Sequence, residues 1–321
     1  MPKGLTSQGV CLLTNGRATI DDIKLALQRQ GFEIAKEMPP SDSWCFGGHA
    51  VLVPFLPESN GYAEVDIVNR PWPDTMGDPK TDFMTFGAWS MGHFGPFAYP
   101  GGLSRAGQQS WIWEGGRGAS SEHRGFIRIR MSYVFGAEKN ARCLPEHYDP
   151  LAELRFLSRA VLALFGAPGV ICYFNPNGEV LCDQATFSGF WEQGKELRQF
   201  PLMLWINVRM YSLDETLIFM DTVGNSQLDV RDVEAIFPRA QYEAADVATH
   251  LRNVTYYLLE SKAEIRTGEA IDGPGESDLS WTTEVVDKGT VTPPRGVLRV
   301  YPKSDRDAVR EALARESRSQ G

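Results

Sequence analysis

The stretch GFIRIRMSYVF at residues 125–135 carries the clearest structural signal in this chain of 321 residues. Apolar and polar side chains alternate along most of it. Because successive side chains of a strand turn to opposite faces of a sheet, the alternation predicts a strand with one apolar side and one polar side. The apolar side is Ile127, Ile129, Met131 and Tyr133, and the polar side is Arg128, Arg130 and Ser132.

The segments before this strand predict further strands and one helix. Residues 9–14 form an apolar strand candidate. Thr19 is a typical helix cap, and the apolar spacing after it predicts a helix that ends at Gly31. Residues 50–56 and 62–68 predict two more strands, which turn residues separate.

The segments after residue 135 predict helices and hairpins in turn. Asp149-Pro150 predicts a helix start, because the aspartate accepts from unpaired backbone amides and proline suits the first turn. The turn 175–178, Asn-Pro-Asn-Gly, predicts the first hairpin. The strands of this hairpin are expected at 170–174 and 179–182. Beyond it we expect strands 202–211, 216–222 and 297–301 and helices 186–197, 229–237 and 242–259. We also expect a long loop at 266–296 and a terminal helix from Ser304.

This order of elements indicates the fold class. Hairpins dominate and a regular strand–helix–strand repeat is absent, so we predict an α+β fold with mostly antiparallel sheets and helices packed on one face. The chain divides either into two related halves, 1–120 and 121–321, or forms one continuous domain. A diverged duplication would explain two halves.

Composition and charge restrict the class of protein. The chain is 42% hydrophobic and 23% charged, which is typical of globular proteins, and its formal net charge is −9. An acidic chain is a poor match for nucleic-acid phosphates but suits a basic protein partner. Five scattered cysteines are typical of reduced thiols. No signal-peptide core or membrane span is evident, so we expect a cytoplasmic protein with no membrane partner.

Residues 69–118 are rich in glycine and aromatic side chains, and we call them the aromatic-glycine region. It contains Trp72, Trp89, Trp111 and Trp113 and shows no helical or strand periodicity. Such a region is typical of loops that present a surface. Arginine beside tryptophan and tyrosine is also the composition of binding hot spots. The alternative is that these rings cover the sheet and the arginines pair with acids.

If the region is a recognition surface, a small set of side chains is expected to contact the partner. Arginines gather at or just after it, at positions 105, 117, 124, 128 and 130. The expected contact residues are Trp89, His93, Tyr99, Arg105, Gln109, Trp111, Trp113 and Arg124.

One pattern in this region has a catalytic interpretation. The sequence AWSMG at 88–92 fits a relaxed nucleophile elbow with Ser90 as nucleophile and His93 or His123 as base. An elbow needs a strand before the serine and a helix after it, and His93 begins a poor helix. A small-molecule hydrolase is therefore the alternative hypothesis.

Other site patterns are weaker. GFWEQGK at 189–195 has phosphate-loop spacing, but two bulky aromatics and a following glutamate oppose phosphate binding, so an amphipathic helix is predicted there. Cys45 and His49 have ligand spacing without a second pair, which structural zinc needs. A short acidic cluster at 229–234 is interpreted as a solvated helix start. We expect no metal and no cofactor.

Several blocks resemble bacterial proteins of unknown function. They are GPFAYPGGLSRAGQQSWIWE (95–114), HRGFIRIRMSYVFG (123–136), CYFNPNGEVL (172–181) and MDTVGNSQLDVRDVEAIFP (220–238). The last block, together with the helix at 242–259 and TGEAIDGPG at 267–275, is similar to domain of unknown function 4261. The resemblance implies no catalytic residue. It implies a setting in the bacterial cytosol, sometimes alongside toxin and secretion systems.

Taken together, these patterns favour a non-enzymatic protein-binding protein. The resemblance implies an immunity or adaptor protein for a toxin or secreted effector. A structural subunit that packs against its own copy is a third hypothesis.

Overall fold

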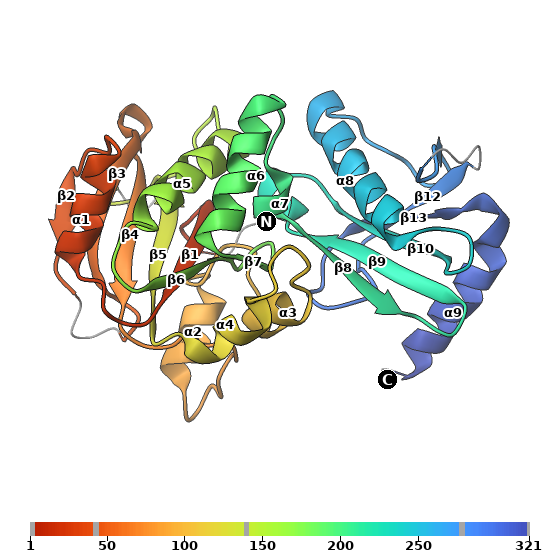
Figure 1. The fold of residues 1–321 in the computed structure, drawn as a ribbon, viewed down its shortest axis with the longest axis horizontal. Helices are drawn as coiled ribbons and strands as arrows, with labels where there is room; N and C mark the ends of the chain where they lie inside the picture. Colours follow the sequence, from red (N-terminus) through yellow and green to blue (C-terminus); the bar gives the residue numbers. More distant parts are fainter. Residues whose placement is uncertain (1–3, 41–44, 138–140, 276–279, 320–321) are drawn as a thin grey trace. The chain divides into compact units, whose positions relative to one another are not determined.

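The computed structural model describes residues 4–40, 45–137, 141–275 and 280–319 (Figure 1). The chain forms two compact units, Met1–Trp205 (unit 1) and Ile206–Gly321 (unit 2). Residue 120, the boundary suggested by the sequence, lies within helix α4 of unit 1. In the described part of the chain, no helix combines the length and apolar character that a membrane crossing requires.

Unit 1 is built on a seven-stranded sheet in the order β2-β3-β4-β5-β1-β6-β7. Every neighbouring pair in it is antiparallel. Its strands are β1 (Gln8–Thr14), β2 (Lys36–Met38), β3 (His49–Leu56), β4 (Gly61–Val68), β5 (Gly125–Ser132), β6 (Val170–Asn175) and β7 (Val180–Cys182). The predicted strands at 9–14, 50–56, 62–68 and 125–135 are therefore confirmed, with small differences at their ends.

Two capped helices lie against this sheet. In α1 (Ile20–Arg29), Thr19 and Asp22 form a reciprocal capping box. In α5 (Pro150–Leu164), the Asp149 carboxylate accepts from the amides of Leu151 and Ala152 at 2.9 and 3.1 Å. Helix α1 packs on β3 and α5 packs on β1. Both predicted helix starts are confirmed, because local cap chemistry fixed them.

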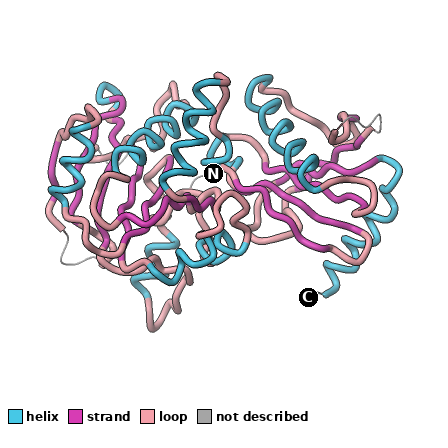
Figure 2. The backbone as a smooth tube through the Cα atoms, viewed as in Figure 1, coloured by secondary structure: helices cyan, strands magenta, loops and turns pink. Residues whose placement is uncertain are grey.

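The other face of the sheet carries the aromatic-glycine region. Here the structure differs from the sequence prediction, because the region contains three short helices, α2 (Phe83–Ser90), α3 (Gly102–Gln108) and α4 (Gly116–Glu122), joined by loops (Figure 2). Helices of seven or eight residues span about two turns, too short for periodicity to stand out, and they form because packing supports them. At the start of α3, for example, the Asp74 carboxylate accepts from the amides of Leu103 and Ser104.

The end of unit 1 contains two more helices, α6 (Gln184–Glu196) and α7 (Leu202–Trp205). Helix α6 confirms the helix expected at 186–197, and residues 189–195 lie inside it. The strand expected over 202–211 begins too early, because its first residues form the one-turn helix α7. There Leu204 donates its amide to the Pro201 carbonyl, and Leu202, Leu204 and Trp205 are all buried.

Unit 2 has a six-stranded sheet in the order β11-β12-β13-β10-β9-β8, in which only the pair β10 and β13 is parallel among the described strands. Its strands are β8 (Asn207–Ser212), β9 (Leu217–Val223), β10 (Asp232–Pro238), β11 (Ala270–Ile271), β12 (Trp281–Val286) and β13 (Val297–Pro302). Helix α8 (Ala244–Ser261) packs on one face and α9 (Arg306–Ser319) on the other. The α+β class with mostly antiparallel sheets is confirmed.

Two predictions for unit 2 are wrong. The helix expected at 229–237 is strand β10, in which Val233, Ala235 and Phe237 face α8 while Asp232 and Glu234 turn to the opposite face. The loop expected at 266–296 contains β11 and β12. In β10 the acidic side chains concealed the strand, because their partners are inside the fold rather than in water. In 266–296 the many glycine, proline and acidic residues between the strands suggested a loop.

Candidate functional site

The part of the aromatic-glycine region that packs against the sheet belongs to the hydrophobic core. Trp72 and Trp89 are 4% and 3% exposed, and their ring centroids lie 6.1 Å apart in an edge-to-face arrangement. Trp72 also contacts Phe126 and Phe174 of the sheet at 5.2 and 5.1 Å. The sequence interpretation counts Trp89 among the contact residues, whereas the structure buries it. Its helix α2 turns Thr85, Ala88 and Trp89 inward together.

A buried ion pair fixes the sheet beneath this layer. Arg128 and Asp66 stand opposite each other on β5 and β4, and both side chains are 1% exposed. Arg128 donates to the two carboxylate oxygens at 3.0 and 2.5 Å. It also donates to the carbonyls of His93 and Phe46 at 2.9 and 2.7 Å. One arginine therefore joins two strands to two overlying loops.

His93 belongs to the same cluster. Its Nδ1 lies 3.0 Å from a guanidinium nitrogen of Arg130, which also pairs with Glu64 at 2.5 Å. Burial, together with the positive charges of Arg130 and Arg128, lowers the pKa of His93 to about 4. Burial opposes ionisation of Asp66, but the two arginines hold its pKa below the ordinary value. At neutral pH His93 is therefore uncharged, and its ring contacts Arg130 in this cluster.

Arg105 has a structural partner as well. Its Nε and Nη2 both donate to one oxygen of Glu179, at 2.9 and 2.6 Å, and Nη1 donates to the Pro100 carbonyl. Beside this pair, the Asn177 side chain accepts from the Phe97 amide at 3.0 Å and donates to the Gly9 carbonyl at 2.6 Å. Two of the sequence blocks that carry the resemblance, 95–114 and 172–181, therefore contact each other directly.

The remaining expected contact residues lie nearer the surface. Trp111 is 58% exposed, and its indole N–H donates to Gln109 Oε1 at 3.2 Å. Trp113 is half-buried against the core, Tyr99 is half-buried, and Arg124 is exposed just before β5. Of the eight residues, Trp89 is buried, Trp111 and Arg124 are exposed, and the other five are half-buried. We call Trp89, together with Trp72 and Arg128, the buried base.

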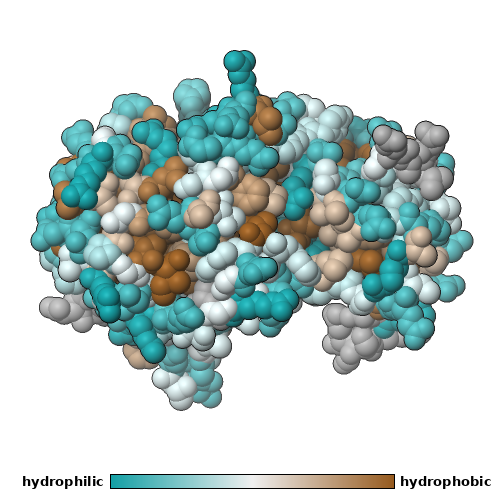
Figure 3. Space-filling model, in the orientation of Figure 1, coloured by the Kyte–Doolittle hydropathy of each residue, from teal (hydrophilic) through white to brown (hydrophobic). Residues whose placement is uncertain are grey.

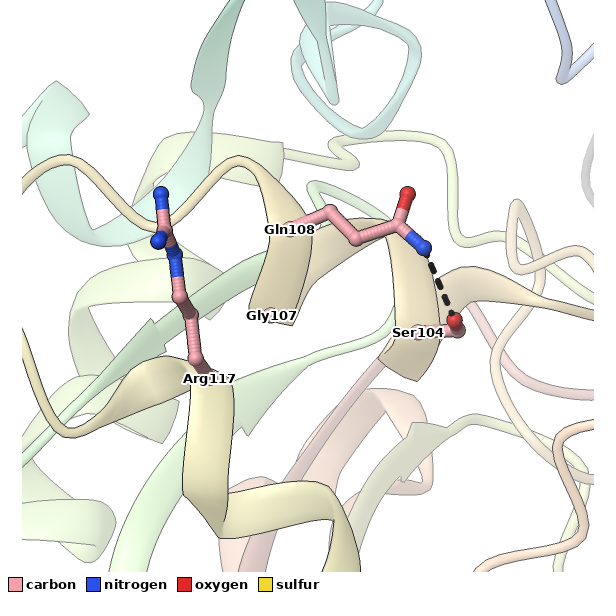
Figure 4. A pocket seen from close by; sticks show the side chains of 4 residues that line it. All are labelled: Ser104, Gly107, Gln108 and Arg117. Atoms are coloured by element: carbon pink, nitrogen blue, oxygen red, sulfur yellow. Dashed lines mark hydrogen bonds between the residues drawn. The ribbon is translucent and has the colours of Figure 1, made fainter.

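An open pocket of about 470 Å³ lies in the exposed part of the aromatic-glycine region. It is lined by Ser104, Gly107 and Gln108 from α3 and by Arg117 from α4 (Figure 4). Gln108 Nε2 donates to Ser104 Oγ over 3.5 Å, at the long limit of a hydrogen bond. Arg117 is exposed. The sequence pointed to Arg117 only as one of several arginines in the region.

The contacts of Ser90 give no support to a serine nucleophile. Ser90 is the last residue of α2, and its hydroxyl donates to the Phe86 carbonyl at 2.8 Å. His93 contacts Arg130, and His123 Nε2 accepts from the Trp72 amide at 2.8 Å. The strand that an elbow needs before the serine is a helix instead.

Of the two candidate metal ligands, His49 has a partner on a neighbouring strand. His49 Nε2 lies 2.8 Å from Glu37 Oε1 on the neighbouring strand. In the ranges that the structure describes, no three or more His, Cys, Asp or Glu side chains come together as a metal site would require. All five cysteines fall in those ranges and are free thiols.

Unit 2 contains a second buried charge cluster, which the sequence interpretation missed. Arg209 and Asp221 stand opposite each other on β8 and β9, and both are 0% exposed. Arg295 donates to Asp221 at 2.5 Å and to Asp232 at 2.9 Å. The acids interpreted as a solvated helix start thus include two buried carboxylates, Asp232 paired with Arg295 and Glu234 paired with Arg299. The alternation of β10 was the signal that could have revealed it.

The same cluster holds the segment 289–296 against the sheet. Thr290 donates its amide and hydroxyl to Glu234 at 2.6 and 3.1 Å. Arg209 donates to the Thr292 carbonyl at 2.9 Å, and Arg299 contacts Glu234 at 3.1 Å. Charged side chains therefore replace an apolar core on this part of the sheet.

Comparison with known proteins gives one match. No curated protein and no solved structure matches the chain. A family model matches residues 221–301, a segment that includes β10 and α8. The segment also contains five of the six charged residues of the unit 2 cluster, which are Asp221, Asp232, Glu234, Arg295 and Arg299. Residues 221–301 match the family described as "Domain of unknown function (DUF4261)", which confirms the resemblance expected for the C-terminal region.

Proposed function

We propose that this protein is a non-enzymatic binding protein that recognises another protein through the exposed part of the aromatic-glycine region. We call this part the Trp111 surface and define it by Ser104, Gln108, Gln109, Trp111 and Arg117. The observation that carries the proposal is the exposure of Trp111, at 58%, with its ring oriented by the hydrogen bond to Gln109.

The distribution of apolar side chains supports this surface. The visible face of the molecule is mostly hydrophilic, with separate apolar patches (Figure 3). Four of the eight exposed large hydrophobic residues in the described ranges lie within residues 69–118. They are Met76, Phe83, Met91 and Trp111. Tryptophan and arginine supply most of the binding energy at many interfaces, so Trp111 and Arg117 are suited to anchor a partner.

The buried base makes the surface suitable for recognition. Arg128 holds the His93 carbonyl, Arg105 pairs with Glu179, and Asp74 caps α3. A surface that is ordered before binding loses less conformational entropy in the complex. The formal net charge of −9 favours a basic partner at long range, which fits an immunity or adaptor role toward a basic toxin or effector.

Affinity capture with matched variants tests the proposal. Leu197 is the matched control for Trp111, because both are 58% exposed and both lie in unit 1. Wild-type protein and Leu197→Ala are expected to retain the same protein partners from the native cell, and Trp111→Ala to lose them. Retention of every partner by a folded Trp111→Ala variant would contradict the proposal. Arg105→Ala is unsuitable here, since it leaves the buried Glu179 without its cation.

A further inference from the structure

We infer that the pocket between α3 and α4 binds the carboxylate of an acidic side chain, aspartate or glutamate, from the protein segment that covers Trp111. This inference rests on the proposed function and adds the chemistry of the partner. The pocket is a recess of about 470 Å³ lined by Ser104, Gly107, Gln108 and Arg117.

Glycines bring the two helices close enough to form this pocket. A Cβ atom added at Gly107 would lie 3.2 Å from the Gly116 carbonyl oxygen, and one added at Gly116 would lie 2.2 Å from Ser110 Oγ. A side chain at Gly107 would therefore press on the backbone of α4, and one at Gly116 would displace Ser110 of the loop that joins the two helices. Arg117 at the start of α4 and Gln108 on α3 both line the pocket, and the Gln108 amide points toward Ser104 (Figure 4).

The groups around the pocket can donate hydrogen bonds, and two acids close to α3, Asp74 and Glu179, already have partners. Ser104 offers a hydroxyl, Gln108 an amide and Arg117 a guanidinium. Asp74 accepts from the amides of Leu103 and Ser104, and Glu179 accepts from Arg105. No acid in the described ranges forms an ion pair with Arg117. The pocket thus presents a cation and two neutral hydrogen-bonding groups to an incoming ligand.

A carboxylate matches this set better than other groups. The planar guanidinium donates two parallel hydrogen bonds to the two oxygens of a carboxylate. The Gln108 amide and the Ser104 hydroxyl are further groups on α3 that can donate hydrogen bonds. Trp111 stands on the loop of residues 109–115 that joins α3 to α4, so it lies close in the chain to Arg117 at the start of α4. That proximity favours an acidic side chain of a protein over a free anion.

Selection from a library of random short peptides tests the inference. The baits are wild type, Arg117→Gln and Trp111→Ala, with Arg29→Gln as the control because Arg29 is an exposed arginine on α1 of the same unit. Wild type and Arg29→Gln are expected to enrich peptides that contain aspartate or glutamate. Arg117→Gln is expected to bind the selected acidic peptides roughly tenfold more weakly, a typical effect of losing a shielded charge pair.

The other outcomes separate the carboxylate inference from the proposed recognition surface. If wild type enriches no acidic peptide, or if Arg117→Gln binds the same acidic peptides equally well, the carboxylate inference fails. If Trp111→Ala loses those peptides while Arg117→Gln keeps them, the recognition surface stands and the carboxylate inference alone fails. Calorimetric titration with inorganic phosphate is the second arm. Phosphate binding that Arg117→Gln abolishes, without any acidic peptide selected, would identify a free anion as the occupant and overturn the inference.

Discussion

The two units share one buried device and use it in different ways. In unit 1, Arg128 and Asp66 stand opposite each other on adjacent antiparallel strands, with two hydrogen bonds of 3.0 and 2.5 Å. In unit 2, Arg209 and Asp221 do the same, at 3.0 and 2.6 Å. Both pairs are almost fully buried. A two-pronged pair of this kind fixes the register of two strands as well as the charge.

The two ion pairs differ in the additional partners that they bind within their units. In unit 1 the arginine is the shared member, because Arg128 also binds the carbonyls of Phe46 and His93. In unit 2 both members are shared, because Arg209 also donates to the Thr292 carbonyl and Asp221 accepts from both Arg209 and Arg295. A shared arginine anchors loop backbone and so supports a surface above it. A shared carboxylate neutralises two cations, so unit 2 depends more heavily on a single acid.

The largest expected effect therefore comes from Asp221→Asn. This change removes the carboxylate that Arg209 and Arg295 share and leaves Arg295 with Asp232, and we expect a loss of unfolding free energy of about 3–5 kcal/mol. Asp66→Asn removes the close partner of one arginine, with Arg130 farther away at 3.9 Å, and should cost less. Urea unfolding of both variants measures the two losses.

Hydrogen exchange of the strand amides identifies which unit opens. Asp221→Asn should increase exchange in β9 and β10 and leave β4 and β5 protected, with Asp66→Asn showing the reverse. An Asp66→Asn loss that equals or exceeds the Asp221→Asn loss would contradict the view that the shared carboxylate makes unit 2 more dependent on one residue.

The second prediction concerns Trp89, the buried member of the pair of tryptophans at positions 89 and 111. Trp89→Ala empties a space lined by Trp72 and Phe94, whose ring centroids lie 6.1 and 4.7 Å away. We expect a loss of about 3 kcal/mol or more in unfolding free energy, as for other buried tryptophans. Thermal unfolding measures it. A loss below about 1 kcal/mol would show that Trp89 is not part of the core.

Local chemistry made much of the fold predictable. The caps at Thr19 and Asp149, the alternation at 125–135 and the apolar stripe of α8 are all readable within a few residues, and all are confirmed. Strand β10 was interpreted as a helix because Asp232 and Glu234 looked solvated. Their partners are arginines far along the chain, since Arg295 follows Asp232 by 63 positions. No local pattern shows such a partner.

The position of the candidate site in the sequence could be predicted, but the burial of its side chains could not. Composition identified the aromatic-glycine region, yet Trp89 and Trp111 have the same side chain and only the packing of α2 against the sheet separates them. The turn at 175–178 was predicted from its residues. Its burial was not, because Asn177 is buried by hydrogen bonds to Phe97 and Gly9, which the sequence does not place beside it.

The third prediction concerns pH and the unit 1 cluster. The pKa of His93 is about 4 in the folded chain and ordinarily 6.5, so the unfolded chain takes up its proton first as pH falls. His93 therefore adds its full stabilisation above pH 6.5, and this is lost as pH falls toward 4. Unfolding free energies measured over this range should fall more steeply for wild type than for His93→Gln. The exposed His147→Gln variant serves as control and should follow wild type. Parallel curves for wild type and His93→Gln would contradict a His93 that stays neutral in the folded chain at neutral pH.

The smallest expected effect on stability comes from Trp111→Ala, and for that reason it is the most informative about function. At 58% exposure the ring loses few contacts on truncation, and its hydrogen bond to Gln109 is at the surface. Changes at such positions usually stay within about 0.5 kcal/mol. Urea unfolding should therefore give nearly the wild-type value, in contrast to Trp89→Ala. A loss of 2 kcal/mol or more, on the order of a core truncation, would assign Trp111 to the buried base. If the stability is unchanged while partner capture is lost, the same side chain type serves packing at position 89 and recognition at position 111.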